Sequence, residues 1–254
     1  MKQINFENIA PLDFASREAY KTLRSNIQFC GDDIKVISVT SCLPNEGKSV
    51  LTFHLAAAMA EAEKKVLMID ADIRKSVMLN RFQADRVEKG LSEYLTGQCL
   101  LDDCLCKTNI KNMDVIFTGP VAPNPSEILG SKKFADLLVQ MREQYDYVLL
   151  DCPPLGSVID AAVVSAKADG AILVIQSDMV SYQFAQQVKN QLEMSGCRIL
   201  GAVLNKIDNE KGNYYSRYGK YYTKRYGYSR DYGYGYEDKN HPEGGKKGKK
   251  RKKG

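Results

Sequence analysis

Residues 38–49, which read SVTSCLPNEGKS, decide the fold of this chain. They place a short polar loop between a buried-type β-branched run and a helical pattern rich in alanine and leucine. The ending Gly47-Lys48-Ser49 in that context is the signature of a phosphate-binding loop (P-loop). Amide N–H groups at the start of a helix point at a phosphate, and the helix dipole favours its charge. We therefore predict that residues 42–49 bind ATP, although Cys42 stands where the signature has its first glycine.

The P-loop residues receive separate predicted roles. Lys48 would reach the β- and γ-phosphate oxygens, and the hydroxyl of Ser49 would bind Mg²⁺. Asn205 ends the last apolar run, in LNKID, and either faces the adenine or satisfies a turn at the end of a strand. The predicted nucleotide-binding set is Pro44, Asn45, Glu46, Gly47, Lys48, Ser49, Val50 and Asn205.

Apolar runs and helical patterns alternate along the chain. The runs are almost continuously apolar, which is typical of strands that are buried on both faces of a parallel sheet. Their alternation with helices predicts an α/β fold, doubly wound, with a mainly parallel sheet of the P-loop NTPase type. The predicted strands are Val36–Thr40, Val66–Ile69, Asp114–Phe117, Tyr147–Leu150, Ala171–Ile175 and Ala202–Leu204. The predicted helices are Arg17–Phe29, Lys48–Ala62, Lys132–Gln144, Ile159–Lys167 and Tyr182–Met194.

Carboxylates follow two of the predicted strands. Asp70 and Asp72 lie in VLMIDADIR, residues 66–74, and Asp151 lies in VLLDCPP, residues 148–154. The carboxyl ends of parallel strands line the ligand crevice of such a sheet. A single aspartate after a strand is often only a helix cap. Three of them beside a P-loop indicate a catalytic site that binds a metal ion.

These carboxylates suit phosphoryl transfer to a hydroxyl group. Mg²⁺ prefers a few hard oxygen ligands, and we assign Ser49, Asp72 and Asp151 to it. Either Asp70 or Asp72 can take the proton of an attacking hydroxyl; we assign this role to Asp70. Arg74 would pair with a phosphate or with these carboxylates. The predicted catalytic set is Lys48, Asp70, Asp72 and Arg74.

The pattern of strands and helices ends near residue 210. We predict a folded domain over residues 1–210 and a disordered tail over 211–254, because the tail has too little apolar surface to order itself. From Tyr214 onward, thirteen Lys and Arg face four Asp and Glu, so the tail carries +9 and the remainder −4. Ten of the fifteen tyrosines lie in the tail, namely Tyr214, Tyr215, Tyr218, Tyr221, Tyr222, Tyr226, Tyr228, Tyr232, Tyr234 and Tyr236.

Composition also bears on location. No stretch reaches the ~18 apolar residues that a membrane span needs. Residues 1–14 lack the apolar core of a signal peptide, and the seven scattered cysteines suit a reducing compartment. We therefore expect a cytoplasmic protein that reaches the inner face of the membrane through a partner or through its basic tail.

The P-loop CLPNEGKS, the segments VLMIDADIR and VLLDCPP, and the tyrosine-rich tail together resemble the bacterial tyrosine kinases (BY-kinases) of capsular and exopolysaccharide synthesis. The resemblance is to the stand-alone cytoplasmic type and covers about residues 14–236. The segments EAYKTLR, residues 18–24, and GPVAPNPSEILGS, residues 119–131, also match this family. Asn45 departs from the family, which often has glycine there, and the terminal KKGKKRKKG is no family feature.

The resemblance implies an ATP- and Mg²⁺-dependent P-loop kinase domain over residues 1–210 that phosphorylates its own C-terminal tyrosines. It implies a ring in which Glu18, Lys21 and Arg24 contact a neighbouring subunit and each subunit phosphorylates the next one's tail. It further implies a membrane activator of the polysaccharide chain-length-determinant type and control of polysaccharide synthesis and export. From the residues alone, Glu18–Arg24 is a solvated helix face with charge pairs.

Two other functions compete with a kinase. One is an ATP-binding switch ATPase of the partitioning or septum-positioning type, whose signature lysine is replaced here by Leu43. The other is a regulator that binds ATP without transferring its phosphate. The lysine run Lys246–Lys253 would bind anionic lipid, or is simply a solvated charge run. We do not expect nucleic acid as a partner, although aromatic residues among basic ones can bind single strands.

Overall fold

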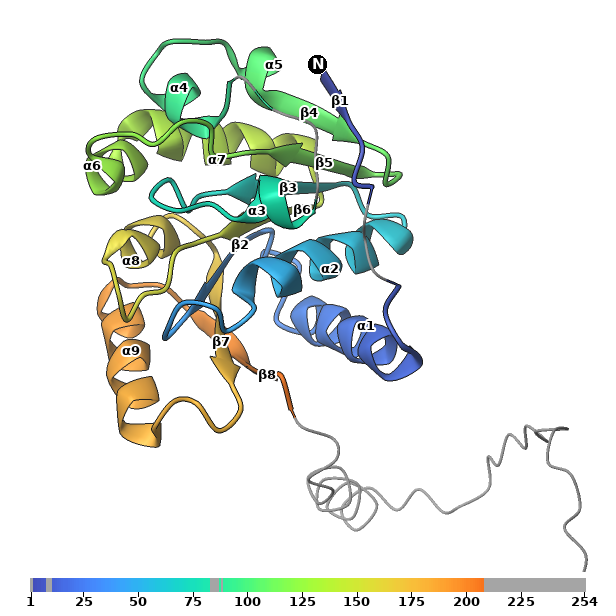
Figure 1. The fold of residues 1–254 in the computed structure, drawn as a ribbon, viewed down its shortest axis with the longest axis vertical. Helices are drawn as coiled ribbons and strands as arrows, with labels where there is room; N and C mark the ends of the chain where they lie inside the picture. The colour runs from blue at the N-terminus through green and yellow to red at the C-terminus, as the bar shows by residue number, and fades with distance from the viewer. Residues whose placement is uncertain (1, 8–10, 83–86, 88, 208–254) are drawn as a thin grey trace, which may run out of the picture. The chain divides into compact units, whose positions relative to one another are not determined.

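The computed structural model describes residues 2–7, 11–82, 87 and 89–207 (Figure 1). The chain divides into a first unit, Met1–Ile207, and a second unit, Asp208–Gly254, which lies outside the described residues. The predicted boundary at residue 210 and the disorder of the tail therefore remain predictions. None of the described helices is long and apolar enough to cross a membrane.

An eight-stranded sheet forms the centre of the first unit. Every neighbouring pair of strands is parallel except β4 and β5, so the prediction of a mainly parallel sheet is confirmed. In spatial order the strands are β1 (Lys2–Ile4), β4 (Leu105–Thr108), β5 (Met113–Ile116), β3 (Val66–Asp70), β6 (Tyr147–Asp151), β2 (Val36–Ser41), β7 (Gly170–Gln176) and β8 (Ile199–Asn205).

Helices connect these strands and cover both faces of the sheet. Side-chain oxygens cap three of them at the N-terminus, because Asp13, Ser131 and Ser181 each accept a hydrogen bond from a backbone amide of the first turn. The longer helices are α1 (Phe14–Gln28), α2 (Lys48–Glu61), α7 (Lys132–Gln144) and α9 (Tyr182–Met194). The shorter ones are α3 (Met78–Arg81), α4 (Leu91–Leu95), α5 (Leu101–Cys104), α6 (Pro125–Gly130) and α8 (Asp160–Ser165).

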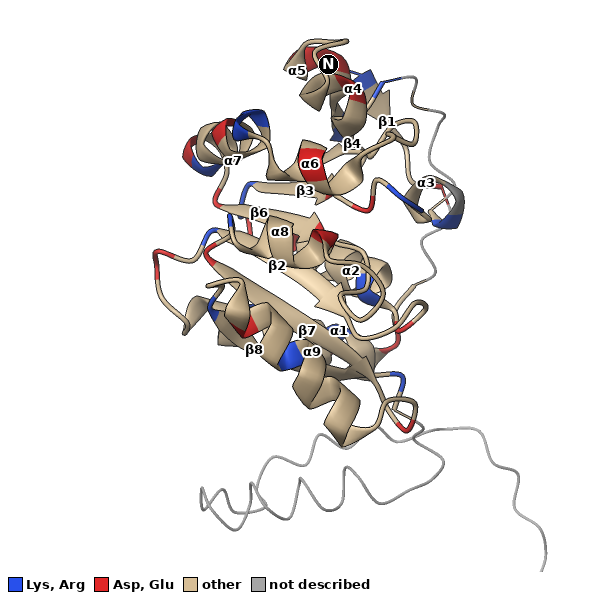
Figure 2. Ribbon diagram, turned by 90° about the vertical axis from the view of Figure 1, so that its left-hand side faces the viewer, with Lys and Arg blue, Asp and Glu red and all other residues tan. Residues whose placement is uncertain are grey.

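The central strands are almost uncharged, and the charged residues lie on helices, loops and strand ends (Figure 2). Alternate residues of each strand enter two separate hydrophobic cores, one on each face of the sheet. Leu67 and Ile69 of β3 join the core that α7 and α9 cover, whereas Val66 and Met68 join the core that α2 covers. Burial on both faces explains why these strands read as continuous apolar runs.

The sequence-based prediction differs from the structure at the edge of the sheet. All six predicted strands exist, but the strand expected at Asp114–Phe117 is Met113–Ile116. Phe117 lies beyond the strand, where its carbonyl accepts the amide of Leu91. The strands β1 and β4 and the short helices α3 to α6 were not predicted. These elements span three to six residues each, too few for a periodic pattern to emerge.

Candidate active site

The P-loop connects the carboxyl end of β2 to the first residue of α2. Two of its residues, Asn45 with φ 66° and Gly47 with φ 94°, have left-handed backbone conformations. A side chain at position 47 would meet a second obstacle, because a Cβ atom there would lie 2.2 Å from Nδ2 of Asn205. Glycine is therefore required at this position, and the loop turns sharply enough to open α2 at Lys48.

Lys48 points into a cluster of carboxylates at the carboxyl ends of β3 and β6. Its Nζ lies 3.5 Å from Oδ2 of Asp72 and 3.8 Å from Oδ1 of Asp151. Burial alone would lower the pKa of Lys48, but the negative charges of Asp151, Asp72 and Asp70 outweigh it and raise that pKa. Lys48 is therefore a buried cation, and the three aspartates hold it in its charged form.

Asp70 is completely buried next to Asp151 in the register of the sheet. Burial, followed by the charge of Asp151, raises the pKa of Asp70 to about 8. Its Oδ1 accepts the amide of Asp72 at 3.2 Å, and its Oδ2 accepts the hydroxyl of Ser76. Burial also raises the pKa of Asp151. Three carboxylates thus share one lysine, which leaves the cluster with an excess of negative charge.

The residues assigned to Mg²⁺ lie together in this cluster. Oδ1 of Asp151 is buried and has no hydrogen-bond partner among the described residues. The hydroxyl of Ser49 lies 3.3 Å from Nζ of Lys48. Ser49 also lowers the pKa of Asp151, although burial has the larger, opposite effect. In the described part of the chain, no three His, Cys, Asp or Glu side chains form a ready metal site. The hydroxyl of Ser49 and the carboxylates of Asp72 and Asp151 are hard oxygen donors, which fit Mg²⁺, since this ion takes few protein ligands and keeps oxygen ligands from water and phosphate.

Arg74 forms its ion pair with Asp160, the first residue of α8, although the charge of Asp72 also raises the pKa of Arg74. Its Nη2 lies 3.0 Å from Oδ1 of Asp160 and 3.2 Å from Oγ of Ser126, and its Nε donates to Oδ2 of Asp160. The hydroxyl of Ser126 donates to Asp160 as well. Burial would raise the pKa of Asp160, but the hydrogen bonds from Arg74 and Ser126 lower it. The sequence predicted that Arg74 would pair with a phosphate or with Asp70, Asp72 or Asp151. In the structure its carboxylate partner is Asp160 instead.

The remaining P-loop residues differ in how their side chains are placed. Pro44 is exposed, Val50 is half-buried, and Glu46 is completely buried. Asn205 donates through Nδ2 to the carbonyl of Glu46 at 2.8 Å. It therefore contacts the P-loop rather than a turn of its own strand; its predicted role toward adenine remains a prediction.

The predicted interface residues lie on α1, which packs beside α2. Glu18 and Lys21 form an exposed ion pair of 2.8 Å, as the helix spacing predicts. Arg24 instead donates through Nη1 to the carbonyl of Ala58 at 2.7 Å, which fastens α1 to α2 within the chain.

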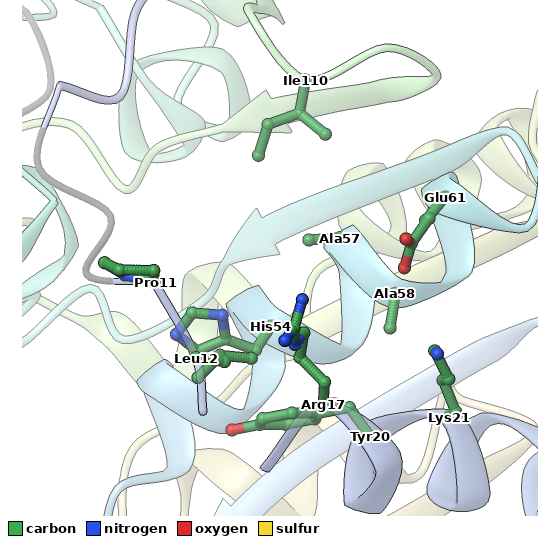
Figure 3. Close-up of a pocket in the computed structure, with 10 residues that line it drawn as sticks. All are labelled: Pro11, Leu12, Arg17, Tyr20, Lys21, His54, Ala57, Ala58, Glu61 and Ile110. Atoms are coloured by element: carbon green, nitrogen blue, oxygen red, sulfur yellow. The ribbon is translucent and has the colours of Figure 1, made fainter. Parts of the chain in front are cut away.

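A pocket of about 300 Å³ lies beside α1 and α2, and no P-loop residue lines it (Figure 3). Its lining is Pro11, Leu12, Arg17, Tyr20, Lys21, His54, Ala57, Ala58, Glu61 and Ile110. The predicted phosphorylation sites, from Tyr214 to Tyr236, lie outside the described residues.

Several residues that hold this site were not found from the sequence. Ser76 holds Asp70, and Asp160 with Ser126 holds Arg74. Ser76 and Ser126 are common residue types at positions without any motif, so only the fold brings them to the site. Asp160 begins a helix, where an acidic residue is expected for reasons of capping alone.

Comparisons with known proteins agree with this geometry. A family model described as an AAA domain matches residues 34–198. The chain is 43% identical over 199 residues to the tyrosine-protein kinase CpsD of Streptococcus pneumoniae serotype 4, covering 78% of this chain and 88% of that protein.

Among solved structures, a kinase domain resembles this chain more closely than a septum site-determining ATPase does. The kinase domain of Escherichia coli tyrosine kinase ETK is 31% identical with a TM-score of 0.73, covering 91% of this chain and 87% of that one. The septum site-determining protein MinD from Pyrococcus horikoshii, complexed with Mg-ADP, is 26% identical with a TM-score of 0.58, covering 67% and 70%. The kinase domain thus matches more of the chain, and matches it more closely.

Proposed function

The chain belongs to the bacterial tyrosine-protein kinases of capsular and exopolysaccharide biosynthesis, and we propose that it uses ATP and Mg²⁺ to phosphorylate the tyrosines of its own C-terminal segment. The observation that carries this proposal is the buried cluster of Lys48 with Asp70, Asp72 and Asp151 beside the P-loop. Phosphoryl transfer depends mainly on positioning and on charge neutralisation, and this cluster supplies a fixed cation and metal-binding oxygens at one place.

Each residue of the cluster has one task in the transfer. The bond between the γ-phosphorus and ADP breaks as a bond to the tyrosine oxygen forms, and the phenolic proton passes to a carboxylate. Lys48 neutralises charge on the phosphate oxygens, because its three acidic neighbours keep it protonated. Ser49, Asp72 and Asp151 would hold Mg²⁺, which supplies further charge neutralisation on the phosphates.

Asp70 is the carboxylate that we propose as proton acceptor. The hydroxyl of Ser76 and the amide of Asp72 fix its two oxygens, so its orientation is determined before a substrate arrives. Asp72 is the alternative acceptor and is the slightly more accessible of the two, 7% exposed against 0% for Asp70. A tyrosine hydroxyl has a pKa near ~10, so it needs such an acceptor at neutral pH.

The assembly follows the family resemblance. We propose a ring in which Glu18, Lys21 and Arg24 face a neighbouring subunit, whose tail enters the active site. A membrane activator of the polysaccharide chain-length-determinant type would recruit the ring to the inner face of the membrane. Because its ten tyrosines are tethered to the ring, the C-terminal segment would meet a neighbour's site at high effective concentration. Each phosphate adds about −1.5 to −2 charges, so a few of them reverse the +9 of the tail.

A switch ATPase remains the second candidate, because MinD shares the fold. Position 43 distinguishes a switch ATPase from a kinase, because this chain has leucine there instead of the signature lysine of such ATPases. Leu43 is uncharged, and its side chain packs against a hydrophobic core. This position therefore supplies no cation for a bound phosphate.

The test is mass spectrometry of the purified full chain after incubation with ATP and Mg²⁺. The proposal predicts phosphotyrosine within residues 214–236, and none in the Asp70→Asn variant. A wild-type chain that hydrolyses ATP without forming phosphotyrosine would support the switch ATPase. A chain that binds ATP without hydrolysis or transfer would instead indicate a regulator.

A further inference from the structure

The outer side of the P-loop is fastened by four residues that we call the P-loop clamp: Glu46, Gln176, Asn205 and Lys206. Glu46 lies in the loop itself, completely buried. Its Oε2 accepts the amide of Leu43 at 2.6 Å, and its Oε1 accepts the amide of Gln176, at the end of β7, at 2.9 Å. One carboxylate thus closes the loop on itself and ties it to the sheet.

Lys206, which follows β8, forms hydrogen bonds with the same loop. Its Nζ donates to the carbonyl of Asn45 at 2.6 Å and to Oε1 of Gln176 at 3.1 Å. Asn205 adds a third bond, from Nδ2 to the carbonyl of Glu46. Two successive carbonyls of the P-loop are therefore held by two successive residues of the last strand end. No acidic partner of Lys206 is found among the described residues, so its charge serves the backbone of the loop.

Backbone conformation on both sides of this contact is unusual. Asn45 has φ 66° and Lys206 has φ 53°; asparagine enters this left-handed region more readily than other residues with side chains, whereas lysine rarely adopts it. A strained backbone conformation persists only where its surroundings enforce it. The bond between these two residues is one such constraint, and it lies directly before the amides that open α2.

We propose that Lys206 is a positioning residue of the nucleotide site, which holds the Asn45 carbonyl outward so that the following amides stay directed at the phosphates. A charge-assisted hydrogen bond is stronger and shorter than a neutral one, and the 2.6 Å distance is of that kind. Lys206 thereby stabilises a loop in which Cys42 replaces the first glycine. This inference rests on the proposed binding of ATP at the P-loop.

The consequence is specific to the phosphates. A loop that is held less firmly would lose affinity for any ligand that binds through its phosphate groups, with or without a base. A residue that contacts the adenine base would affect ATP alone. Comparing ATP with tripolyphosphate therefore separates positioning of the loop from recognition of the base.

The experiment measures binding of ATP–Mg²⁺ and of tripolyphosphate–Mg²⁺ to the full chain by isothermal titration calorimetry. Lys206→Met keeps most of the length of the side chain but removes its charged amino group, and we expect Kd to rise about tenfold for both ligands. Lys206→Arg should restore most of the affinity. Gln176→Leu removes only the second acceptor and should raise both Kd values about threefold. Lys189→Met on α9 is the matched control, because Lys189 pairs with the exposed Glu193 and contacts no P-loop residue in the described part of the chain.

The outcomes are distinguishable. If wild-type chain does not bind ATP, the proposed function fails. If wild-type chain binds ATP and Lys206→Met binds both ligands as tightly as Lys189→Met does, the positioning role of Lys206 is wrong. A rise in Kd for ATP alone would overturn it as well and assign Lys206 to the base. A thermal unfolding midpoint equal to that of wild type, together with rescue by arginine, excludes a general loss of structure.

Discussion

The two ends of the parallel sheet hold their acidic side chains in opposite ways. At the carboxyl end, Asp70, Asp72 and Asp151 share the single cation Lys48, and the pKa values of Asp70 and Asp151 are raised. At the amino end, Asp169 precedes β7 and binds the guanidinium of Arg142. Burial would raise the pKa of Asp169, but Arg142 and two backbone amides lower it.

This difference indicates that the carboxylate at the amino end stabilises the fold, whereas those at the carboxyl end serve a ligand. The carboxylate at the amino end has all the partners it needs, since Arg142 and the amides of Lys35 and Val36 surround it. At the carboxyl end one lysine serves three carboxylates, and Oδ1 of Asp151 has no hydrogen bond among the described residues. Excess negative charge of this kind destabilises a fold, and it persists where a ligand cation completes it.

The strongest test of this contrast is Asp70→Asn. We expect phosphotyrosine formation to fall at least about a hundredfold, because the variant loses the proton acceptor. The same variant should be more stable by about 0.5–2 kcal/mol in urea unfolding at pH 7, because asparagine does not bear the cost that a raised pKa imposes on the buried Asp70 at this pH. A variant that loses stability would show that Asp70 is a structural carboxylate, like Asp169.

Arg142→Met probes the opposite end. The variant should lose about 1–2 kcal/mol of unfolding free energy, because it leaves the half-buried Asp169 with two amides but no cation. It also removes the bond from Nη2 of Arg142 to the carbonyl of Asp33. Urea unfolding at pH 7 measures this loss. Nucleotide binding should stay unchanged, and a change of more than about threefold would contradict the separation of the two ends.

The pH dependence of stability should show the same contrast at the amino end. The folded-state pKa of Asp169 is lowered, so its ion pair contributes stability above the unfolded-state pKa of about 3.9, and this contribution is lost as the pH falls through the folded-state value. Asp169→Asn should therefore flatten the decrease in stability below about pH 4. Urea titrations at several pH values would check this. An unchanged acid limb would mean that Asp169 is not the group that titrates.

The smallest effect is expected on the surface of α1. Glu18→Gln breaks the exposed pair with Lys21 and should change stability by less than about 0.5 kcal/mol. If these residues contact a neighbouring subunit, the same substitution should reduce oligomerisation in light scattering. Asp136→Asn on α7 provides an exposed control with the same change of charge. Loss of stability without a change in oligomer size would contradict an interface role.

The sequence predicts the strands and longer helices because they are buried on a regular period. It also brings Lys48, Asp70, Asp72 and Asp151 to one edge, since the ends of parallel strands meet there. It does not predict what holds them. Asp160 and Lys206 contact the site from distant positions, and Ser76 follows Asp70 by six residues at a position without a motif. The three-residue strand β1 is likewise fixed only by tertiary pairing with β4.

Phosphotyrosine formation by Lys48→Met and Arg142→Met, compared side by side with wild type, tests most directly whether the carboxyl end of the sheet is the kinase site. Each variant removes one cation from a carboxylate at one end of the same sheet. Transfer should be lost in Lys48→Met and retained within about threefold in folded Arg142→Met at 25 °C. Retained transfer in Lys48→Met, or equal losses in both variants, would contradict the assignment of this site.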